Sequence, residues 1–207
     1  KKILGLIPIR LNSKRLSQKA LLYIDNFPMV VHVYKRAKLS KKLNEVIVCC
    51  ESKKIFKILK HYGCKAIMTS TKHKNGTERI AEGYQKIKRN FDLVIDIQGD
   101  EPLIDPGHID QIIDFHLNNN DADIVLPSLK ISKQENDNII KIAKDVDNKV
   151  LYLSRSKVPY DFNRHGGIKK IIKAGYNSYV MTAVLTHDGV MHIAGYLPWV
   201  GENLYRS

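Results

Sequence analysis

Hydrophobic residues occur along this chain in two alternating patterns. Short continuous apolar runs, typical of strands buried on both faces, span residues 4–9, 45–50, 65–68, 92–98 and 123–129. Between them, apolar residues recur every third or fourth position, as in amphipathic helices, within residues 29–37, 55–62, 80–87 and 109–117. This alternation predicts an α/β fold with a mostly parallel sheet and helices on both faces. In such sheets, ligands bind beyond the carboxyl ends of the strands.

Length and charge narrow the class of protein. With 207 residues the chain can form one domain with its own core, so we expect a single domain over residues 1–207. Its 34 Lys and Arg against 21 Asp and Glu give a net charge of +13. The lysines are scattered and no nucleic-acid-binding module is visible, so we expect no nucleic-acid partner. A solvated basic surface and the capture of a small, highly anionic substrate both remain open.

Neither a membrane segment nor a disulfide framework is indicated. The chain has no apolar run of the roughly 18 residues that cross a bilayer, and its first ten residues, KKILGLIPIR, do not resemble a signal peptide. We therefore expect a cytoplasmic protein without membrane contact. The chain has three cysteines, Cys49, Cys50 and Cys64, and the first two are neighbours in the sequence. An odd number and this spacing predict reduced, buried thiols rather than disulfides or a metal cage.

The loop after the first predicted strand is rich in cations. Arg10, Arg15 and Lys19 are candidates for binding a triphosphate, with Ser13 between them, because guanidinium groups match planar pairs of phosphate oxygens. An exposed basic loop is the alternative. Neither a dinucleotide-binding glycine pattern nor a P-loop follows this strand.

A carboxylate follows the fourth predicted strand, in the segment Gln-Gly-Asp-Glu-Pro at residues 98–102. Asp100 is a candidate Mg²⁺ ligand, because Mg²⁺ binds through one or two carboxylate oxygens while substrate phosphates complete its coordination. Gly99 would let a ligand approach the backbone. The alternative, an acid that caps the next helix, is better filled by Asp105, which precedes Pro106.

A third polar cluster, residues 73–79, precedes the third predicted helix. Gly76 permits close backbone approach, Thr77 and the first helical amides can donate hydrogen bonds, and Arg79 offers two parallel donors. A helix-capping loop with surface charges is an equally good interpretation. His73 in this loop has no evident carboxylate partner in the sequence and is better read as structural than as a base.

Together these clusters resemble the sugar-acid cytidylyltransferases, most closely the 3-deoxy-manno-octulosonate cytidylyltransferase (CMP-Kdo synthetase) family. Gly-Thr-Glu-Arg at 76–79 followed by Gln-Gly-Asp-Glu-Pro at 98–102 is the most specific signal. The order and spacing hold over residues 1–160, and the other matching residues are Pro8, Arg10, Ser13, Arg15, Leu16, Lys19, Pro28, Met29, His32, Met68, Thr69, His73, Asn138, Lys141, Ser154, Arg155 and Pro159.

The resemblance implies a three-layer, Rossmann-like nucleotidyltransferase fold and a specific reaction. CMP would pass from CTP to the anomeric hydroxyl of a Kdo-like eight-carbon sugar acid, releasing pyrophosphate, for bacterial lipopolysaccharide or capsule. Mg²⁺ would be the cofactor, with CTP and the sugar acid as partners and a homodimer as one arrangement left open.

The resemblance also implies roles for individual residues. Asp100 would hold the metal, and Gln98 and Arg155 would bind the sugar hydroxyls and carboxylate. The nucleotide would be bound by the first loop and the third cluster, that is by Arg10, Ser13, Arg15, Lys19, Gly76, Thr77 and Arg79.

The chain departs from the family pattern in places. Ser17 and Gln18 replace Pro-Gly, Cys50 and Glu51 replace Thr-Asp, and Lys169 stands where a tyrosine is expected. Residues 161–207 are divergent or truncated, although 180–185 and 190–193 predict short strands. Because a second metal carboxylate belongs to that part of the family, the alternatives are a CTP-binding pseudo-enzyme or a transferase for another acid sugar.

Overall fold

The structure is a computed structural model of the 207-residue chain. It describes residues 1–11, 16, 18–119, 121–128, 139–145, 147–155, 175–176, 182–187, 190–195 and 204–206. The last four of these segments are described as backbone strands.

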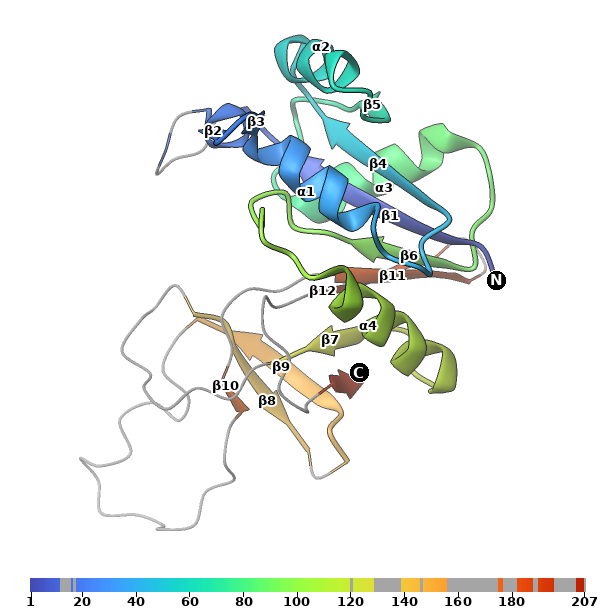
Figure 1. Ribbon diagram of the computed structural model, residues 1–207. Coiled ribbons are helices and arrows are strands. Elements are labelled where there is room, and N and C mark those ends of the chain that lie inside the picture. The colour runs from blue at the N-terminus through green and yellow to red at the C-terminus, as the bar shows by residue number, and fades with distance from the viewer. Residues whose placement is uncertain are drawn as a thin grey trace, which may run out of the picture.

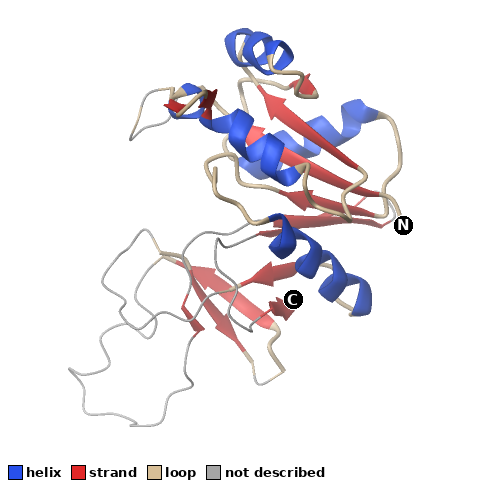
Figure 2. Ribbon diagram, viewed as in Figure 1, coloured by secondary structure: helices blue, strands red, loops and turns tan. Residues whose placement is uncertain are grey.

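A six-stranded sheet forms the centre of the molecule (Figures 1 and 2). Its order is β12-β11-β6-β1-β4-β5, in which β6, β1, β4 and β5 are parallel and the β11–β12 hairpin adds to β6 antiparallel. The predicted mostly parallel sheet is confirmed. The strands are β1 (Ile3–Ile9), β4 (Glu45–Cys50), β5 (Ala66–Met68), β6 (Leu93–Asp96), β11 (Thr182–His187) and β12 (Val190–Gly195).

Four helices follow the predicted apolar stripes, namely α1 (Met29–Ala37), α2 (Lys53–His61), α3 (Gly76–Ile87) and α4 (Pro106–Asn118). Asp105 caps α4 by accepting a hydrogen bond of 2.8 Å from the Gly107 amide, with Pro106 in the first turn. The predicted cap is therefore confirmed. In the part of the chain that the structure describes, no helix is both long and apolar enough to span a bilayer.

Helices cover both faces of the sheet, which gives three layers. Because successive strand side chains point to opposite faces, Leu4 and Leu6 pack with Ile80 of α3, whereas Ile3 and Ile7 belong to the core that α1, α2 and α4 cover. The three cysteines are free and buried, as predicted. Burial raises the pKa of the Cys50 and Cys64 thiols to about 11, so at neutral pH they behave as small apolar groups.

Smaller elements extend from this central unit. A second, antiparallel sheet has the order β10-β8-β9 and lies apart from the main sheet in Figure 1. The one-turn helix η1 (Lys19–Leu21) leads into the β2–β3 hairpin. The remaining strands are β2 (Tyr23–Ile24), β3 (Phe27–Pro28), β7 (Val125–Pro127), β8 (Lys141–Lys144), β9 (Val150–Ser154), β10 (Gly175–Tyr176) and β13 (Leu204–Arg206).

Candidate functional site

The carboxyl ends of three adjacent parallel strands bring the candidate residues to one edge of the sheet. β1 lies between β4 and β6, so the segments that follow these strands are neighbours. Arg10 follows β1 and is exposed, Glu51 follows β4, and residues 97–101 follow β6. This edge is where a parallel α/β sheet binds its ligands.

Lys19 and Asp100 meet at this edge. The Nζ of Lys19 lies 2.7 Å from Oδ2 of Asp100, and the two side chains are 37% and 52% exposed. The neighbouring Glu101 is buried, and this burial, together with the charge of Asp100, raises its pKa to about 7. The edge therefore combines an accessible carboxylate with a cation and a second acid that is half protonated near neutral pH.

Two glycines at the edge pack against the end of β1. A Cβ on Gly99 would lie 2.1 Å from Cδ1 of Ile9 and 3.0 Å from the carbonyl oxygen of Pro8. We expected Gly99 to leave space for a ligand, but the space is filled by protein. A Cβ on Gly76 would lie 3.2 Å from Cγ of Pro8. Both glycines therefore allow neighbouring segments to approach Pro8, and Gly76 places the start of α3 beside the end of β1.

The start of α3 is capped by the loop before it. The Asn75 side chain accepts a hydrogen bond of 2.9 Å from the Glu78 amide, and Glu78 Oε2 accepts one of the same length from the Lys74 amide. The capping interpretation is thus confirmed. The first-turn amides of Gly76 and Thr77 have no intrahelical acceptor, and Thr77 is exposed, so an anion role for this turn is still a prediction.

Arg79 is placed differently from the expected accessible pair of donors. Its side chain is 5% exposed and forms an ion pair with Glu51. Its Nη1 also donates to Thr69 Oγ1 at 2.7 Å and to the Ser70 carbonyl at 3.1 Å. The guanidinium is thus engaged by protein groups at the ends of β4 and β5. These contacts give Arg79 a supporting role in the site, and direct binding of the nucleotide by Arg79 stays a prediction.

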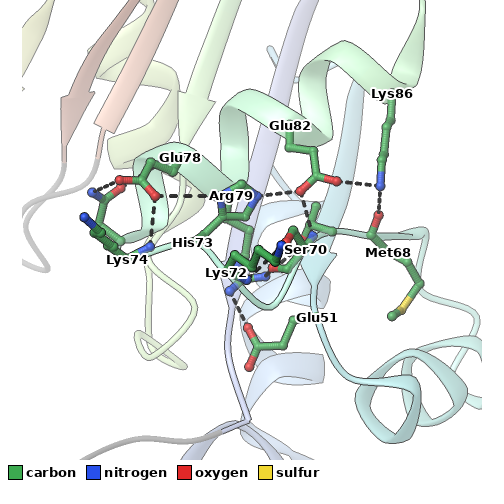
Figure 3. A network of polar contacts seen from close by, with 12 residues as sticks. Glu51, Met68, Ser70, Lys72, His73, Lys74, Glu78, Arg79, Glu82 and Lys86 are labelled. Carbon is green, nitrogen blue, oxygen red and sulfur yellow. Dashed lines mark hydrogen bonds and ion pairs between the residues drawn. The ribbon is translucent and has the colours of Figure 1, made fainter.

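His73 has the carboxylate partner that the sequence did not reveal. Its Nε2 lies 2.5 Å from Oε2 of Glu82, which also accepts a hydrogen bond of 2.6 Å from the Ser70 amide (Figure 3). Hydrogen bonds from Lys86 and from Ser70 lower the pKa of the Glu82 carboxyl to about 2. Glu82 therefore ties the loop before α3 to the helix, and a structural role for His73 agrees with this.

Sequence reasoning gave no role to Glu82, and it noted Glu51 only as a departure from the family pattern. Glu82 lies one helical turn after Glu78, and this four-residue spacing places both carboxylates on the same side of α3. Glu51 directly follows the apolar residues 46–50 of β4, and Arg10 directly follows the apolar strand β1 in the same way.

The other candidates lie in different places. Gln98 is half-buried, and its Nε2 donates to Asp96 Oδ1 at 3.3 Å. Arg155 follows β9 of the second sheet, where its carbonyl accepts a hydrogen bond of 2.5 Å from Lys141 Nζ. Ser13 and Arg15 lie outside the described residues. The structure thus groups Arg10, Lys19, Gly76, Thr77, Gln98 and Asp100 at one sheet edge and places Arg155 on the second sheet.

Comparison with known proteins identifies the family of this site. The sequence profile of the family described as cytidylyltransferase matches residues 4–191. The chain belongs to the cytidylyltransferase family. The match includes every strand of the central sheet from β1 to β11 and continues past residue 160, where the recognisable motifs end. The predicted membership is confirmed, and with it the assignment to the nucleotidyltransferases.

Several relatives of this cytidylyltransferase carry the same name, 3-deoxy-manno-octulosonate cytidylyltransferase. The protein of Thermodesulfovibrio yellowstonii is 42% identical over 164 residues, which are 75% of this chain and 64% of that protein. The protein of Fusobacterium nucleatum is 36% identical over 193 residues, which are 92% of this chain and 78% of that protein. The chain thus spans slightly less than two thirds of the first relative and about four fifths of the second.

Solved structures confirm the nucleotidyltransferase fold. A CMP:2-keto-3-deoxy-manno-octonic acid synthetase complexed with CTP superposes with a TM-score of 0.74 at 28% identity, over 88% of this chain and 73% of that one. A cytidylyltransferase from Leptospira borgpetersenii superposes with a TM-score of 0.52 at 26% identity, over 60% of this chain and 52% of that one.

Proposed function

We propose that this cytidylyltransferase transfers CMP from CTP to the anomeric hydroxyl of 3-deoxy-manno-octulosonate and releases pyrophosphate. The observation that carries the proposal is the contact between Lys19 and Asp100 at the carboxyl edge of the sheet, in a chain whose relatives bear this activity in their name. The product would supply bacterial lipopolysaccharide or capsule synthesis. Both substrates are anionic, so the net positive charge of the protein would speed their capture and needs no nucleic-acid partner to explain it.

The first loop would provide most of the catalytic positioning. In-line attack of the sugar hydroxyl on the α-phosphorus places negative charge on the equatorial and leaving oxygens, so fixed cations and hydrogen-bond donors lower the barrier. Arg10 and Lys19 would bind the triphosphate and stabilise the leaving pyrophosphate, together with Ser13 and Arg15. The first-turn amides and hydroxyl at Gly76 and Thr77 would bind the nucleotide at the start of α3.

Asp100 fits a Mg²⁺ site. Its carboxylate is half exposed at the sheet edge, and the part of the chain described by the structure contains no group of three His, Cys, Asp or Glu side chains arranged around a metal. A protein contribution of one or two oxygens matches Mg²⁺, which keeps several waters and uses substrate phosphates as further ligands. When bound, Mg²⁺ would offset the negative charge that develops on the phosphate oxygens.

The sugar acid would be recognised by Gln98 and Arg155. Gln98 follows the same strand as Asp100 and can hydrogen-bond to sugar hydroxyls. Arg155 is exposed on the second sheet, and its guanidinium would pair with the sugar carboxylate through two parallel hydrogen bonds.

A pyrophosphate-release assay with CTP, Mg²⁺ and a panel of sugar acids tests the proposal. We expect turnover with 3-deoxy-manno-octulosonate and loss of turnover in Asp100→Asn, which keeps the shape of the side chain and removes its charge. Asp105→Asn is the matched control, because Asp105 lies in the same loop with 53% side-chain exposure and asparagine also caps helices. Its activity should remain at the wild-type level.

Two outcomes would contradict the proposal. A fully active Asp100→Asn variant would exclude the metal role of Asp100. CTP binding without turnover on any acid of the panel would instead identify the chain as a CTP-binding module.

A further inference from the structure

Glu51 connects the first loop to the buried part of the site. Its Oε1 accepts a hydrogen bond of 2.8 Å from the Leu11 amide, and its Oε2 forms the ion pair with Arg79. The Glu51 side chain is 14% exposed, so both interactions are largely removed from water. Hydrogen bonds to an ionised carboxylate are the stronger kind, and this one holds the backbone directly after Arg10.

Arg79 holds the Glu51 carboxylate in place through their ion pair. Its contacts with Thr69 and with the Ser70 carbonyl fix the guanidinium at the end of β5, while its own backbone belongs to α3. The planar guanidinium offers several donors in fixed directions, so it joins three elements at once (Figure 3). The Leu11 amide is thereby anchored to β4, β5 and α3 through a single carboxylate.

The opposite end of the loop has separate anchors. Gln18 Oε1 accepts a hydrogen bond of 2.6 Å from Lys54 Nζ, and Lys19 contacts Asp100. The Leu22 carbonyl accepts a hydrogen bond of 2.8 Å from the Met29 amide. These contacts act at the far end of the loop, whereas the hydrogen bond of the Leu11 amide to Glu51 acts directly after Arg10, and the pairing of Ile9 with Cys50 acts directly before it.

We propose that Glu51 is a positioning residue for Arg10. Held by Arg79, it fixes the Leu11 amide and so sets the place and direction from which the Arg10 side chain meets the triphosphate of CTP. The inference rests on the proposed function. The carboxylate itself contacts no substrate in this scheme and acts through the loop backbone.

A double variant, Glu51→Leu with Arg79→Met, separates positioning from folding. Replacing a buried ion pair by apolar side chains of similar volume is often neutral for stability, whereas a single change at Glu51 leaves a buried charge without a partner. The double variant removes the acceptor of the Leu11 amide and both charges together. Glu51→Asp keeps a carboxylate and serves as the conservative variant.

The matched control lies at the other end of the same strand. Glu45, the first residue of β4, is 11% exposed and pairs with Arg89 at 2.7 Å. The double variant Glu45→Leu with Arg89→Met removes a carboxylate of similar exposure from the opposite edge of the sheet, together with an arginine that is 58% exposed. Lys65, which also pairs with Glu45 at 2.6 Å, is itself 62% exposed and stays in contact with water.

The variants are compared by CTP affinity, by kcat/KM for CTP, by hydrogen exchange of the Leu11 amide and by circular dichroism. We expect the Glu51→Leu, Arg79→Met protein to keep its folded spectrum, to exchange the Leu11 amide faster and to lose kcat/KM by about 10- to 100-fold, since small misplacements of catalytic groups cost this much. Its CTP affinity should also fall. Glu51→Asp should retain most of the wild-type value, and the control double variant should stay within about twofold.

Either of two results would overturn the inference. One is wild-type CTP affinity and kcat/KM in the Glu51→Leu, Arg79→Met protein, and the other is an equal loss in the control pair. If the wild-type protein turns over no sugar acid, the proposed function fails. The CTP affinity and the exchange of the Leu11 amide would still decide the role of Glu51.

Discussion

The ammonium group of Lys19 and the carboxylate of Asp100 lie 2.7 Å apart although 81 residues separate them in the sequence. The contact joins the end of the first loop to the segment that follows β6. A cation therefore already neutralises the carboxylate that we propose for Mg²⁺, and this cation is one of the groups that we propose for the triphosphate. Binding of Mg²⁺ and CTP would separate the pair. Asp100 would then bind the metal ion, and Lys19 would bind the triphosphate.

Replacing Lys19 should have opposite effects on catalysis and on metal binding. We expect Lys19→Met to lower kcat/KM for CTP by about 100-fold, a typical loss for one stabilising group in a transition state. Its Mg²⁺ affinity in the absence of CTP should rise about fivefold, because two unit charges about 4 Å apart interact by about 1 kcal/mol in water. Isothermal titration with Mg²⁺ and steady-state kinetics measure the two effects.

Lys54→Met is the control for this variant. Lys54 also contacts the first loop, through Gln18, and its removal should leave Mg²⁺ affinity unchanged. An unchanged Mg²⁺ affinity in Lys19→Met would show that the pair does not compete with the metal.

Gly99 should be required for packing rather than for ligand access. A Cβ at this position would meet Ile9 and the backbone oxygen of Pro8, so we expect Gly99→Ala to lower the free energy of unfolding by about 1–3 kcal/mol, as overpacked sites do. Gly107→Ala is the control, because there a Cβ would meet only the Asp105 side chain, at 3.2 Å. Urea denaturation of both proteins without ligand would reveal the difference, and equal stability of the two would contradict this account.

Gln18 occupies a backbone conformation that favours glycine. Its φ of 52° and ψ of 27° lie in the left-handed region, which costs a residue with a Cβ roughly 1 kcal/mol or more. Gln18→Gly removes this cost but adds entropy to the unfolded chain, so we expect a stability equal to wild type or up to about 1 kcal/mol higher. Gln18→Val, with a branched Cβ, should lose about 1–2 kcal/mol. Thermal unfolding of the two variants measures these changes, and a stable Gln18→Val protein would contradict the argument.

Local patterns were sufficient to predict the sheet and its helices. Apolar runs and stripes depend on the periodicity of one segment, and the predicted strand over residues 4–9 and the cap at Asp105 both follow from neighbouring residues alone. Gln18 stands where the resemblance implies a glycine, and its backbone is in the left-handed region that glycine favours. Here the surrounding fold overrides the local preference of glutamine.

Contacts between distant segments were not predictable from those patterns. Arg79 was expected to point its donors toward a ligand, but the half-buried carboxylate of Glu51, 28 residues earlier in the chain, pairs with it. The periodicity of α3 places Arg79 and Ile80 on adjacent buried positions, and only the packing of α3 against the ends of β4 and β5 brings Glu51 within reach. The position of the site at the carboxyl ends of the strands was therefore predictable from the sequence. Which charged side chains pair with one another there could be seen only in the tertiary structure.

Glu82 should make stability depend on acid pH in a defined window. Its pKa is lowered from the ordinary value of 4.5 to about 2 by Lys86 and the Ser70 amide, so the folded state favours the charged carboxylate. The resulting stabilisation is fully present above pH 4.5 and is lost as the pH falls from 4.5 through 2. We expect Glu82→Gln to be less stable than wild type at pH 6 and to approach wild type near pH 2. Urea midpoints of both proteins across this range test the prediction, and a difference that stays constant down to pH 2 would show that the ionised carboxylate is not the stabilising group.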